Sequence, residues 1–127
     1  MDWIQQTIRE FGASRGLGEL EFEFDSILEL DLPGGELLGI CHIPELPLHE
    51  MLVYASAPLR FDPLRQLEAA LRLANVRCHS YGQVQTGIQD ERLVMAVHLP
   101  ARAFDLPLLN LTVNSLLEMQ EKAAAAA

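Results

Sequence analysis

The sequence has few cysteines, few basic residues and no long apolar run, and each shortage excludes a class of protein. Two cysteines, Cys41 and Cys78, are too few for the disulfide framework of a small secreted domain. Nine Lys and Arg against eighteen Asp and Glu give a net charge of -9, so nucleic acid and anionic lipid are not expected partners. No segment approaches the roughly 18 apolar residues of a membrane-spanning helix, so no membrane insertion is expected.

Signatures of targeting and of catalysis are also missing. Met1-Asp2-Trp3 does not begin a basic and then apolar secretory signal, so we expect a cytoplasmic protein. The sequence contains no G-x-S-x-G, no G-x-x-x-x-G-K-[ST] phosphate-binding loop, no G-x-G-x-x-G and no H-E-x-x-H. We therefore predict that the protein is not an enzyme, has no catalytic residues and needs no cofactor.

Two Cys-His pairs, Cys41-His42 and Cys78-His79, are the features closest to a metal site. Neighbouring residues on a strand point to opposite faces of the sheet, so one pair rarely supplies two ligands. Zinc ligands are also usually separated by about two to four residues, which neither pair satisfies. We therefore predict no metal ligands.

What the sequence does contain is a large share of apolar residues, which make up 50% of its 127 positions. A chain of this length can build a core without a structural metal. We assign residues 1–122 to a single domain and residues 123–127 to an alanine-rich tail without function. Residues 1–60 carry eleven acidic residues and three arginines, whereas residues 61–127 are almost neutral. The field that would attract a basic partner therefore belongs to the first half.

Hydrophobic periodicity predicts the order α-β-β-β-α-β-β-α. Apolar residues three or four apart predict helices at 2–13, 62–75 and 105–122, with Asp62 and Asp105 as caps. Alternating residues predict strands at 19–32, 36–43, 51–57, 82–88 and 93–99, the first with a break near Asp25-Ser26. Helices and strands are segregated, so the fold class is α+β, an antiparallel sheet flanked by helices.

The acidic positions of the first strand, Glu19, Glu21, Glu23 and Asp25, have two interpretations. A calcium site or a catalytic carboxylate pair requires oxygens that converge, whereas a strand spreads them along a line. We favour a solvated face that discourages edge-to-edge sheet pairing. The last helix is apolar on more than one stripe, which indicates contact on a second side, and self-association or a client groove would use such surface.

In this order and pattern, the chain resembles the Tir-chaperone-like (class I) type III secretion chaperones. The resemblance rests on the leucine-rich hairpin ILELDLPGGEL at 27–37, on MLVYASAPL at 51–59, and on LVMAVHLP at 93–100 followed by the closing helix. It covers residues 3–121.

The resemblance implies a homodimeric chaperone of the bacterial cytoplasm that serves virulence. Such a chaperone binds the N-terminal segment of a secreted effector as an extended, partly unfolded chain and keeps it soluble and export-competent. Delivery to the secretion ATPase or sorting apparatus would follow. By position, the dimer interface would comprise Leu64, Leu67, Leu71, Ala74 and Val84. The effector-binding residues would be Trp3, Ile8, Leu28, Leu30, Leu38, Ile40, Leu52, Tyr54, Leu109, Val113 and Leu116.

Two other classes of function stay open at this point. The first is a non-catalytic α+β adaptor or regulatory module that binds a folded partner. The second is a small enzyme or ligand-binding domain that uses His98, His42 or Asp90 as acid-base groups. An enzyme of this kind would need an enclosed cavity with a titratable group in it.

Overall fold

The computed structural model describes residues 2–18, 20–21, 27–44, 49–76 and 83–127. Its helices are α1 (Asp2–Ser14), α2 (Pro63–Val76) and α3 (Leu106–Ala125), with a short 3-10 helix, η1 (Ala101–Ala103), before α3. Its strands are β1 (Ile27–Asp31), β2 (Leu37–Ile43), β3 (Glu50–Pro58), β4 (Gln85–Gln89) and β5 (Arg92–Pro100). The predicted order of helices and strands and the α+β class are therefore confirmed.

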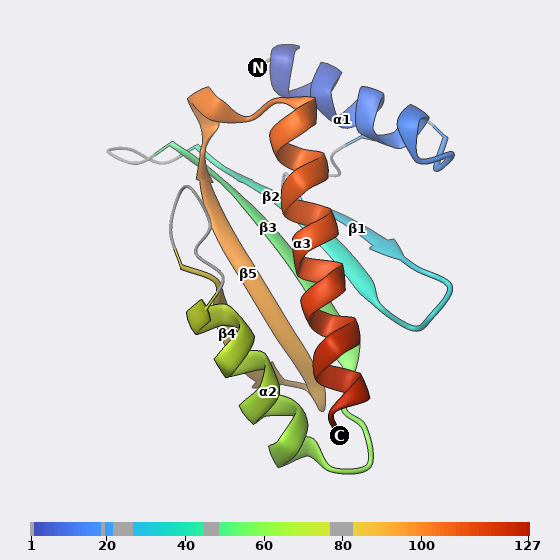
Figure 1. Ribbon diagram of the computed structural model, residues 1–127. Coiled ribbons are helices and arrows are strands. Elements are labelled where there is room, and N and C mark those ends of the chain that lie inside the picture. Colours follow the sequence, from blue (N-terminus) through green and yellow to red (C-terminus); the bar gives the residue numbers. More distant parts are fainter. Residues whose placement is uncertain (1, 19, 22–26, 45–48, 77–82) are drawn as a thin grey trace.

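The strands form one five-stranded sheet in the order β1-β2-β3-β5-β4 (Figure 1), and every neighbouring pair is antiparallel. Strands β3 and β5 are the two longest and occupy the middle and the adjacent position. The turn between β4 and β5 is made by Asp90 and Glu91, whose φ angles are 53° and 61°. A two-residue hairpin of type I′ requires positive φ at both positions, so this turn fixes the β4–β5 register.

The helices gather on one face of the sheet (Figure 1). Helix α3 crosses β3 and β5, α1 lies beside the beginning of α3, and α2 lies next to α3 and β4. The core lies between these helices and the sheet, and its fully buried side chains include Phe11, Ile40, Val53, Met95 and Leu116. None of the described helices covers the opposite face of the sheet.

Aspartate caps begin two of the helices, as predicted. The Leu108 N–H donates to Asp105 Oδ1 at 2.9 Å, and the Arg65 N–H donates to Asp62 Oδ1 at 3.2 Å. A side-chain acceptor at this position satisfies one of the N–H groups that a helix start leaves unpaired. Helix α3 continues to Ala125, three residues beyond the predicted end, and Ala123 is fully buried.

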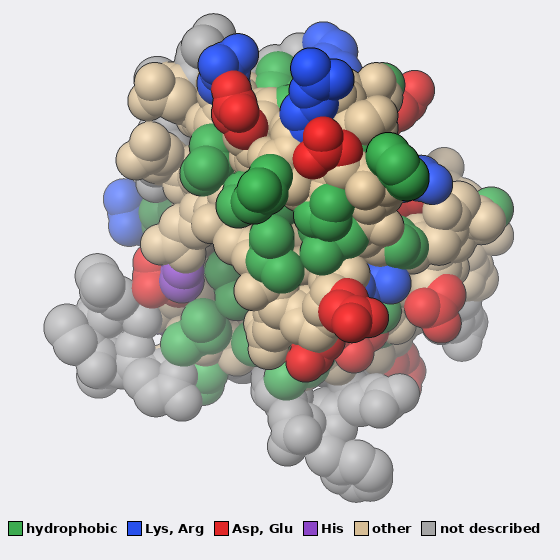
Figure 2. All heavy atoms as spheres, turned by 90° about the horizontal axis from the view of Figure 1, so that it is seen from below, with side chains coloured by type: hydrophobic (Ala, Val, Ile, Leu, Met, Phe, Trp, Pro, Cys, Tyr) green, Lys and Arg blue, Asp and Glu red, His purple; other side chains and the backbone are tan. Residues whose placement is uncertain are grey.

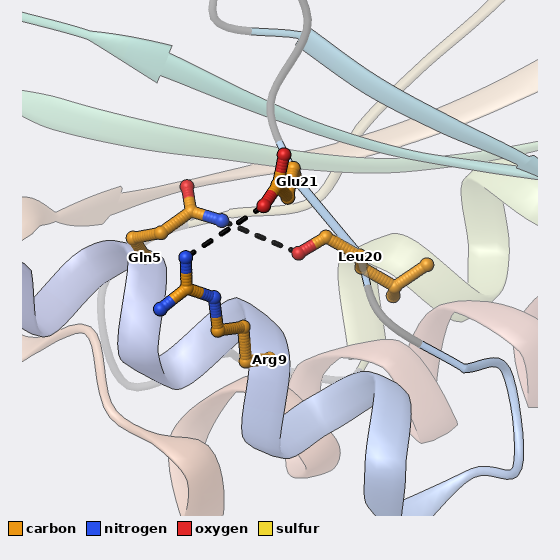
Figure 3. Close-up of polar contacts among 4 residues, drawn as sticks. All are labelled: Gln5, Arg9, Leu20 and Glu21. Carbon is orange, nitrogen blue, oxygen red and sulfur yellow. Dashed lines mark hydrogen bonds and ion pairs between the residues drawn. The ribbon is translucent and has the colours of Figure 1, made fainter.

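The predicted long strand at 19–32 is only partly a strand. Strand β1 begins at Ile27, and the predicted break at Asp25-Ser26 lies outside the described residues. Leu20 and Glu21 lie along α1 instead (Figure 3): Gln5 Nε2 donates to the Leu20 carbonyl at 3.2 Å, and Arg9 pairs with Glu21 at 3.7 Å.

Gly12 makes this approach of chain to helix feasible. A Cβ atom at position 12 would lie 2.8 Å from Leu20 Cγ and 2.6 Å from the Gly18 carbonyl oxygen. Leu20 is consequently buried against α1. After the helix ends, the chain turns back along it instead of continuing as a strand.

Gln120 ties α3 to the middle of the sheet. Its Nε2 donates to the carbonyl oxygens of Ala55 in β3 and Leu93 in β5, both at 2.9 Å. We predict that Gln120→Ala lowers the free energy of unfolding by about 1–3 kcal/mol, because it removes two buried hydrogen bonds between α3 and the sheet. Urea denaturation measures this difference. Glu121→Ala, at the exposed neighbouring position, is the control and should change it by less than about 0.5 kcal/mol; equal effects would contradict the assigned role.

Candidate functional site: the uncovered face of the sheet

The uncovered face of the sheet carries a continuous apolar strip across three strands. Cross-strand pairing places Leu37 in β2 beside Ser56 in β3, and Ser56 beside Val94 in β5. The same pairing places Tyr54 beside Ala96, and Leu52 in the next row towards the other end of β3. Because side chains alternate along a strand, all of these point away from α3. The described residues place no second layer over them, and they are half-buried, with the exception of Ser56, which is buried.

A hollow of about 400 Å³ lies on this face, which we call the sheet hollow. Its floor is mostly apolar and its rim is polar, a combination typical of binding sites. The residues that line it are Glu29, Leu37, Leu52, Tyr54, Ser56, Gln89, Asp90, Arg92, Val94 and Ala96.

Tyr54 is held across the strip by two contacts. Its ring covers Gly39, where a Cβ atom would lie only 1.9 Å from Tyr54 Cζ. Its hydroxyl donates to Glu29 Oε2 at 2.5 Å. Burial raises the pKa of the Tyr54 phenol above its usual range, and the hydrogen bond to the Glu29 carboxylate raises the pKa further. The hydroxyl is therefore a neutral donor at physiological pH, fixed in place on the floor of the hollow.

Arg92 closes one end of the sheet hollow. Its Nε donates to Ser56 Oγ at 2.9 Å, and its terminal nitrogen donates to the carbonyl oxygens of Gly35 at 2.8 Å and of Ser56 at 3.2 Å. These bonds join β5 to β3 and to the β1–β2 turn. Arg92 therefore stabilises the shape of the hollow and is not left available as an isolated cation.

The three groups that an enzyme would use are not brought together. Asp90 lines the sheet hollow, and His98 lies on the same face but pairs with Glu50 at 3.6 Å. His42 points to the covered face, where its Nε2 lies 2.7 Å from Nε2 of His49. The face is suited to binding. Its polar side chains hydrogen-bond neighbouring strands to one another and do not form an acid–base pair around a common substrate position.

The structure places the predicted effector-binding residues in two settings. Leu52 and Tyr54 lie on the uncovered face, Trp3 is 46% exposed on α1, and Leu30 is half-buried at the edge of the core. The other seven are buried between the helices and the sheet and present no surface to a client: Ile8, Leu28, Leu38, Ile40, Leu109, Val113 and Leu116. The sequence does not distinguish the two faces of a strand when both are apolar, which is why these seven were included.

The predicted dimer residues divide in the same way. Leu64 and Leu71 on α2 are 77% and 49% exposed, and Leu67 is half-buried. Ala74 and Val84 are buried in the core of the single chain. Figure 2, which views the molecule from the end where α2 and the end of α3 lie, shows apolar side chains gathered in the middle with acidic and basic side chains around them.

Sequence reasoning missed Leu37, Val94 and Ala96 on the uncovered face, and Phe61, which is fully exposed before α2. The first three follow from Tyr54 by the two-residue period once the strand register is known. Phe61 stands next to a helix cap, and no periodicity marks it.

Two properties of the described residues bear on other classes of function. In this part of the chain, no three His, Cys, Asp or Glu side chains lie close enough together to hold a metal ion. None of the helices described is sufficiently long and apolar to traverse a bilayer. Cys41 and His42 point to opposite faces of β2, as predicted, and the pair Cys78-His79 lies outside the described residues.

The fold is that of solved type III secretion chaperones. A chain of the HopA1–SchA chaperone–effector complex matches with a TM-score of 0.72 at 15% identity, covering 98% of this chain and 94% of that chain. The Yersinia pestis type III secretion chaperone SycH, in complex with a stable fragment of YscM2, gives 0.70 at 18% identity, covering 98% and 99%. YbjN from E. coli, put forward as a transcription regulator, gives 0.55 at 17% identity, covering 95% and 89%. No family model and no curated protein matches the sequence.

The close contact between Tyr54 and Gly39 gives a test of the floor of the sheet hollow. We predict that Gly39→Ala destabilises the fold by about 1–3 kcal/mol, because the new methyl group forces the Tyr54 ring to move. Gly87→Ala is the matched control in β4, where nothing lies within 4 Å of a Cβ atom, and it should leave stability unchanged or slightly raised. Chemical denaturation of both variants decides, and equal losses would show that the ring does not occupy this place.

Proposed function

We propose that the protein is a type III secretion chaperone of the Tir-chaperone-like class. In this proposal it binds the N-terminal segment of a secreted effector as an extended, partly unfolded chain and keeps it soluble. The observation that carries the proposal is the uncovered apolar face of the sheet. It stands on a fold shared with solved secretion chaperones, and the described residues bring no catalytic groups together on it.

The shape of the face favours an extended client. An extended chain presents every second side chain to one side, and the sheet hollow offers apolar floor positions with polar groups at the rim. A volume of about 400 Å³ accommodates a few side chains at a time, not a folded domain. Leu52, Val94 and Ala96 supply the floor, and Tyr54 supplies a fixed aromatic surface.

The charge of the site favours a client segment with basic residues. Two carboxylates, Glu29 and Asp90, and one guanidinium, Arg92, line the hollow, so the carboxylates outnumber the cation there. The whole chain carries a net charge of -9. The field at the hollow is therefore negative, which attracts a basic segment and speeds its encounter with the face.

In the cell, this function implies the bacterial cytoplasm and a role in virulence. The loaded chaperone would hand its client to the secretion ATPase or the sorting apparatus. No cofactor is needed for these steps, because binding and release of a chain require no chemistry.

The client site can be tested by placing a charge on the floor of the sheet hollow. We predict that Leu52→Asp weakens binding of an effector's N-terminal segment at least tenfold, because the carboxylate loses hydration when the client covers it. The probe is the labelled N-terminal segment of a candidate secreted effector, and fluorescence anisotropy measures the affinity. Leu111→Asp, on the exposed side of α3, is the matched control and should bind as wild type.

Two outcomes of this binding experiment would contradict the proposal. Equal affinity of the Leu52→Asp and wild-type proteins, with unchanged circular dichroism, would show that the client lies elsewhere. A bound partner whose amides stay protected from hydrogen exchange would instead favour an adaptor that binds a folded protein, an alternative that the fold similarity to YbjN keeps open.

We also propose that the chain forms a homodimer through α2. Leu64 and Leu71 are seven residues apart, so they lie on the same side of the helix, and both are exposed. Residues 60–76 carry three arginines against one Asp and one Glu, so two copies meet here with less repulsion than their total charge would give.

A charge on α2 tests the dimer. We predict that Leu71→Asp makes the protein monomeric at micromolar concentration, because two carboxylates would be buried at the contact. Sedimentation velocity measures the mass of the particle, and Leu111→Asp again serves as the control. A Leu71→Asp protein that remains dimeric would show that α2 is not the contact.

A further inference from the structure

Gly87 is a glycine in the middle of β4 for which the described part of the chain gives no internal reason. Glycine weakens a strand, and a positive φ angle or the close approach of another group usually accounts for it. Gly87 is not among the glycines of positive φ, and no described atom beyond its chain neighbours lies within 4 Å of a Cβ atom placed there. Gly39 differs, because the Tyr54 ring occupies that place. A group that approaches Gly87 must therefore come from outside the described residues.

Gly87 lies on the uncovered face, at the edge of the sheet that β4 forms. It pairs with Val94, which lines the sheet hollow. A smaller hollow of about 280 Å³, which we call the edge hollow, lies over β4, and its lining residues are Gln85, Thr86, Gly87, Ile88, Gln89, Val94 and Ala96. The last three of these line the sheet hollow as well, so the two hollows are continuous.

The joined hollows cross the strands instead of following one of them. Glu29 lies in β1 and Gly87 in β4, which are the two edge strands of the five-stranded sheet. Neighbouring strands lie about 4.8 Å apart, so the crossing spans roughly 19 Å, the length of about six extended residues. A short extended segment is therefore sufficient to cover the whole path.

The charged side chains along this path favour a segment with basic residues. Glu29 accepts a hydrogen bond from the Tyr54 hydroxyl, and it pairs with no cation among the described residues. Asp90 adds a second carboxylate, whereas Arg92 is the one cation that lines either hollow and donates to Ser56. The two carboxylates outnumber this cation, so a basic client segment is attracted to the path.

We infer that the main chain of the client segment crosses the sheet from β1 to β4 and passes directly over Gly87. The inference rests on the proposed function and adds to it the path of the client and the residue that admits it. A side chain at position 87 would project into the edge hollow beside Val94, where the client's backbone lies. Gly87 is thus a position at which the lack of a side chain serves binding and not folding.

The test fills position 87 without disturbing the fold. Gly87→Val should be at least as stable as wild type in chemical denaturation, because valine favours a strand and no described atom obstructs it. The same variant should bind the client about tenfold more weakly, or worse, and Gly87→Ala should lose less because a methyl group is smaller. The probe is the labelled N-terminal segment of the candidate effector that wild type binds most tightly, and fluorescence anisotropy measures the affinity.

Thr86→Val is the matched control in the same strand. Thr86 pairs with the core residue Met95, so its side chain lies on the covered face. Its hydroxyl has no hydrogen-bond partner among the described residues, so the substitution removes no such bond. This variant should bind the client as wild type does.

A second measurement does not depend on added bulk and replaces the first if Gly87→Val fails to fold. The thiol of Gly87→Cys is alkylated with iodoacetamide, and mass spectrometry of the peptide that contains position 87 gives the rate. A saturating client segment should abolish this reaction. Alkylation of Leu111→Cys, on the exposed side of α3, should be unaffected.

Three results would overturn the inference: client binding by Gly87→Val as tight as wild type, an equal loss in Thr86→Val, or unprotected alkylation of Gly87→Cys. Sedimentation velocity adds a check on self-association. A Gly87→Val protein that loses its dimer but keeps its client would assign the position to a contact between copies, which also overturns the inference.

The design separates this inference from the proposed function. A wild-type protein that binds none of the candidate segments defeats the proposed function, and the inference with it. Weak binding by Leu52→Asp together with unchanged binding by Gly87→Val keeps the client on the sheet hollow and removes only the path over β4.

Discussion

The alternation of side chains along β3 and β5 is the constraint on which the rest of the structure depends. In β5 every second residue is buried, and the residues between are half-buried. One set, which includes Met95 and Val97, forms the core under α3, and the other set, which includes Val94 and Ala96, forms the floor of the sheet hollow. Because one strand supplies both, the packing of the core fixes the geometry of the proposed binding face. A shift of the register by one residue would exchange the two sets.

This constraint also explains how much the sequence alone could predict. The periodicity was sufficient for the order of the elements and the α+β class; in α1, for example, Ile4, Ile8 and Phe11 repeat at helical spacing and are all buried. It was not sufficient for the first strand, because the alternation begins at Glu19 whereas β1 begins at Ile27. Periodicity says which residues of β2 and β3 share a face, but not which face the helices cover. Leu38 and Ile40 lie in the core and Leu52 lies on the other face, although all three are similarly apolar and the sequence does not separate them. The uncovered face depends on the position of α3, which is a tertiary property.

The apolar residues of α3 are a second case in which the sequence alone did not predict which surface is exposed. The sequence indicated a helix with more apolar surface than one contact needs. In the fold, Leu109, Val113 and Leu116 are buried against the sheet, while α1 packs on the first part of the helix. The helix thus meets two layers of its own protein, which accounts for most of its apolar width, and Leu111 is its one large apolar residue left exposed among those described. Outside α3, the most exposed large apolar side chains among the described residues are Phe61, Leu64 and Leu71.

The separation of these two surfaces has a consequence for how a client could be held. The sheet hollow lies on one face of the sheet, whereas the exposed residues Leu64 and Leu71 lie on α2, which is on the other face. In the dimer proposed above, contact through α2 would leave the uncovered face of each copy accessible. Such a dimer would carry two equivalent apolar strips, and one extended segment that reached both would gain affinity from the high effective concentration of the second site. A folded partner of fixed shape could use both strips only if its own geometry matched. The proposed dimer would therefore favour an unfolded client, because an extended chain adapts to the distance between the strips.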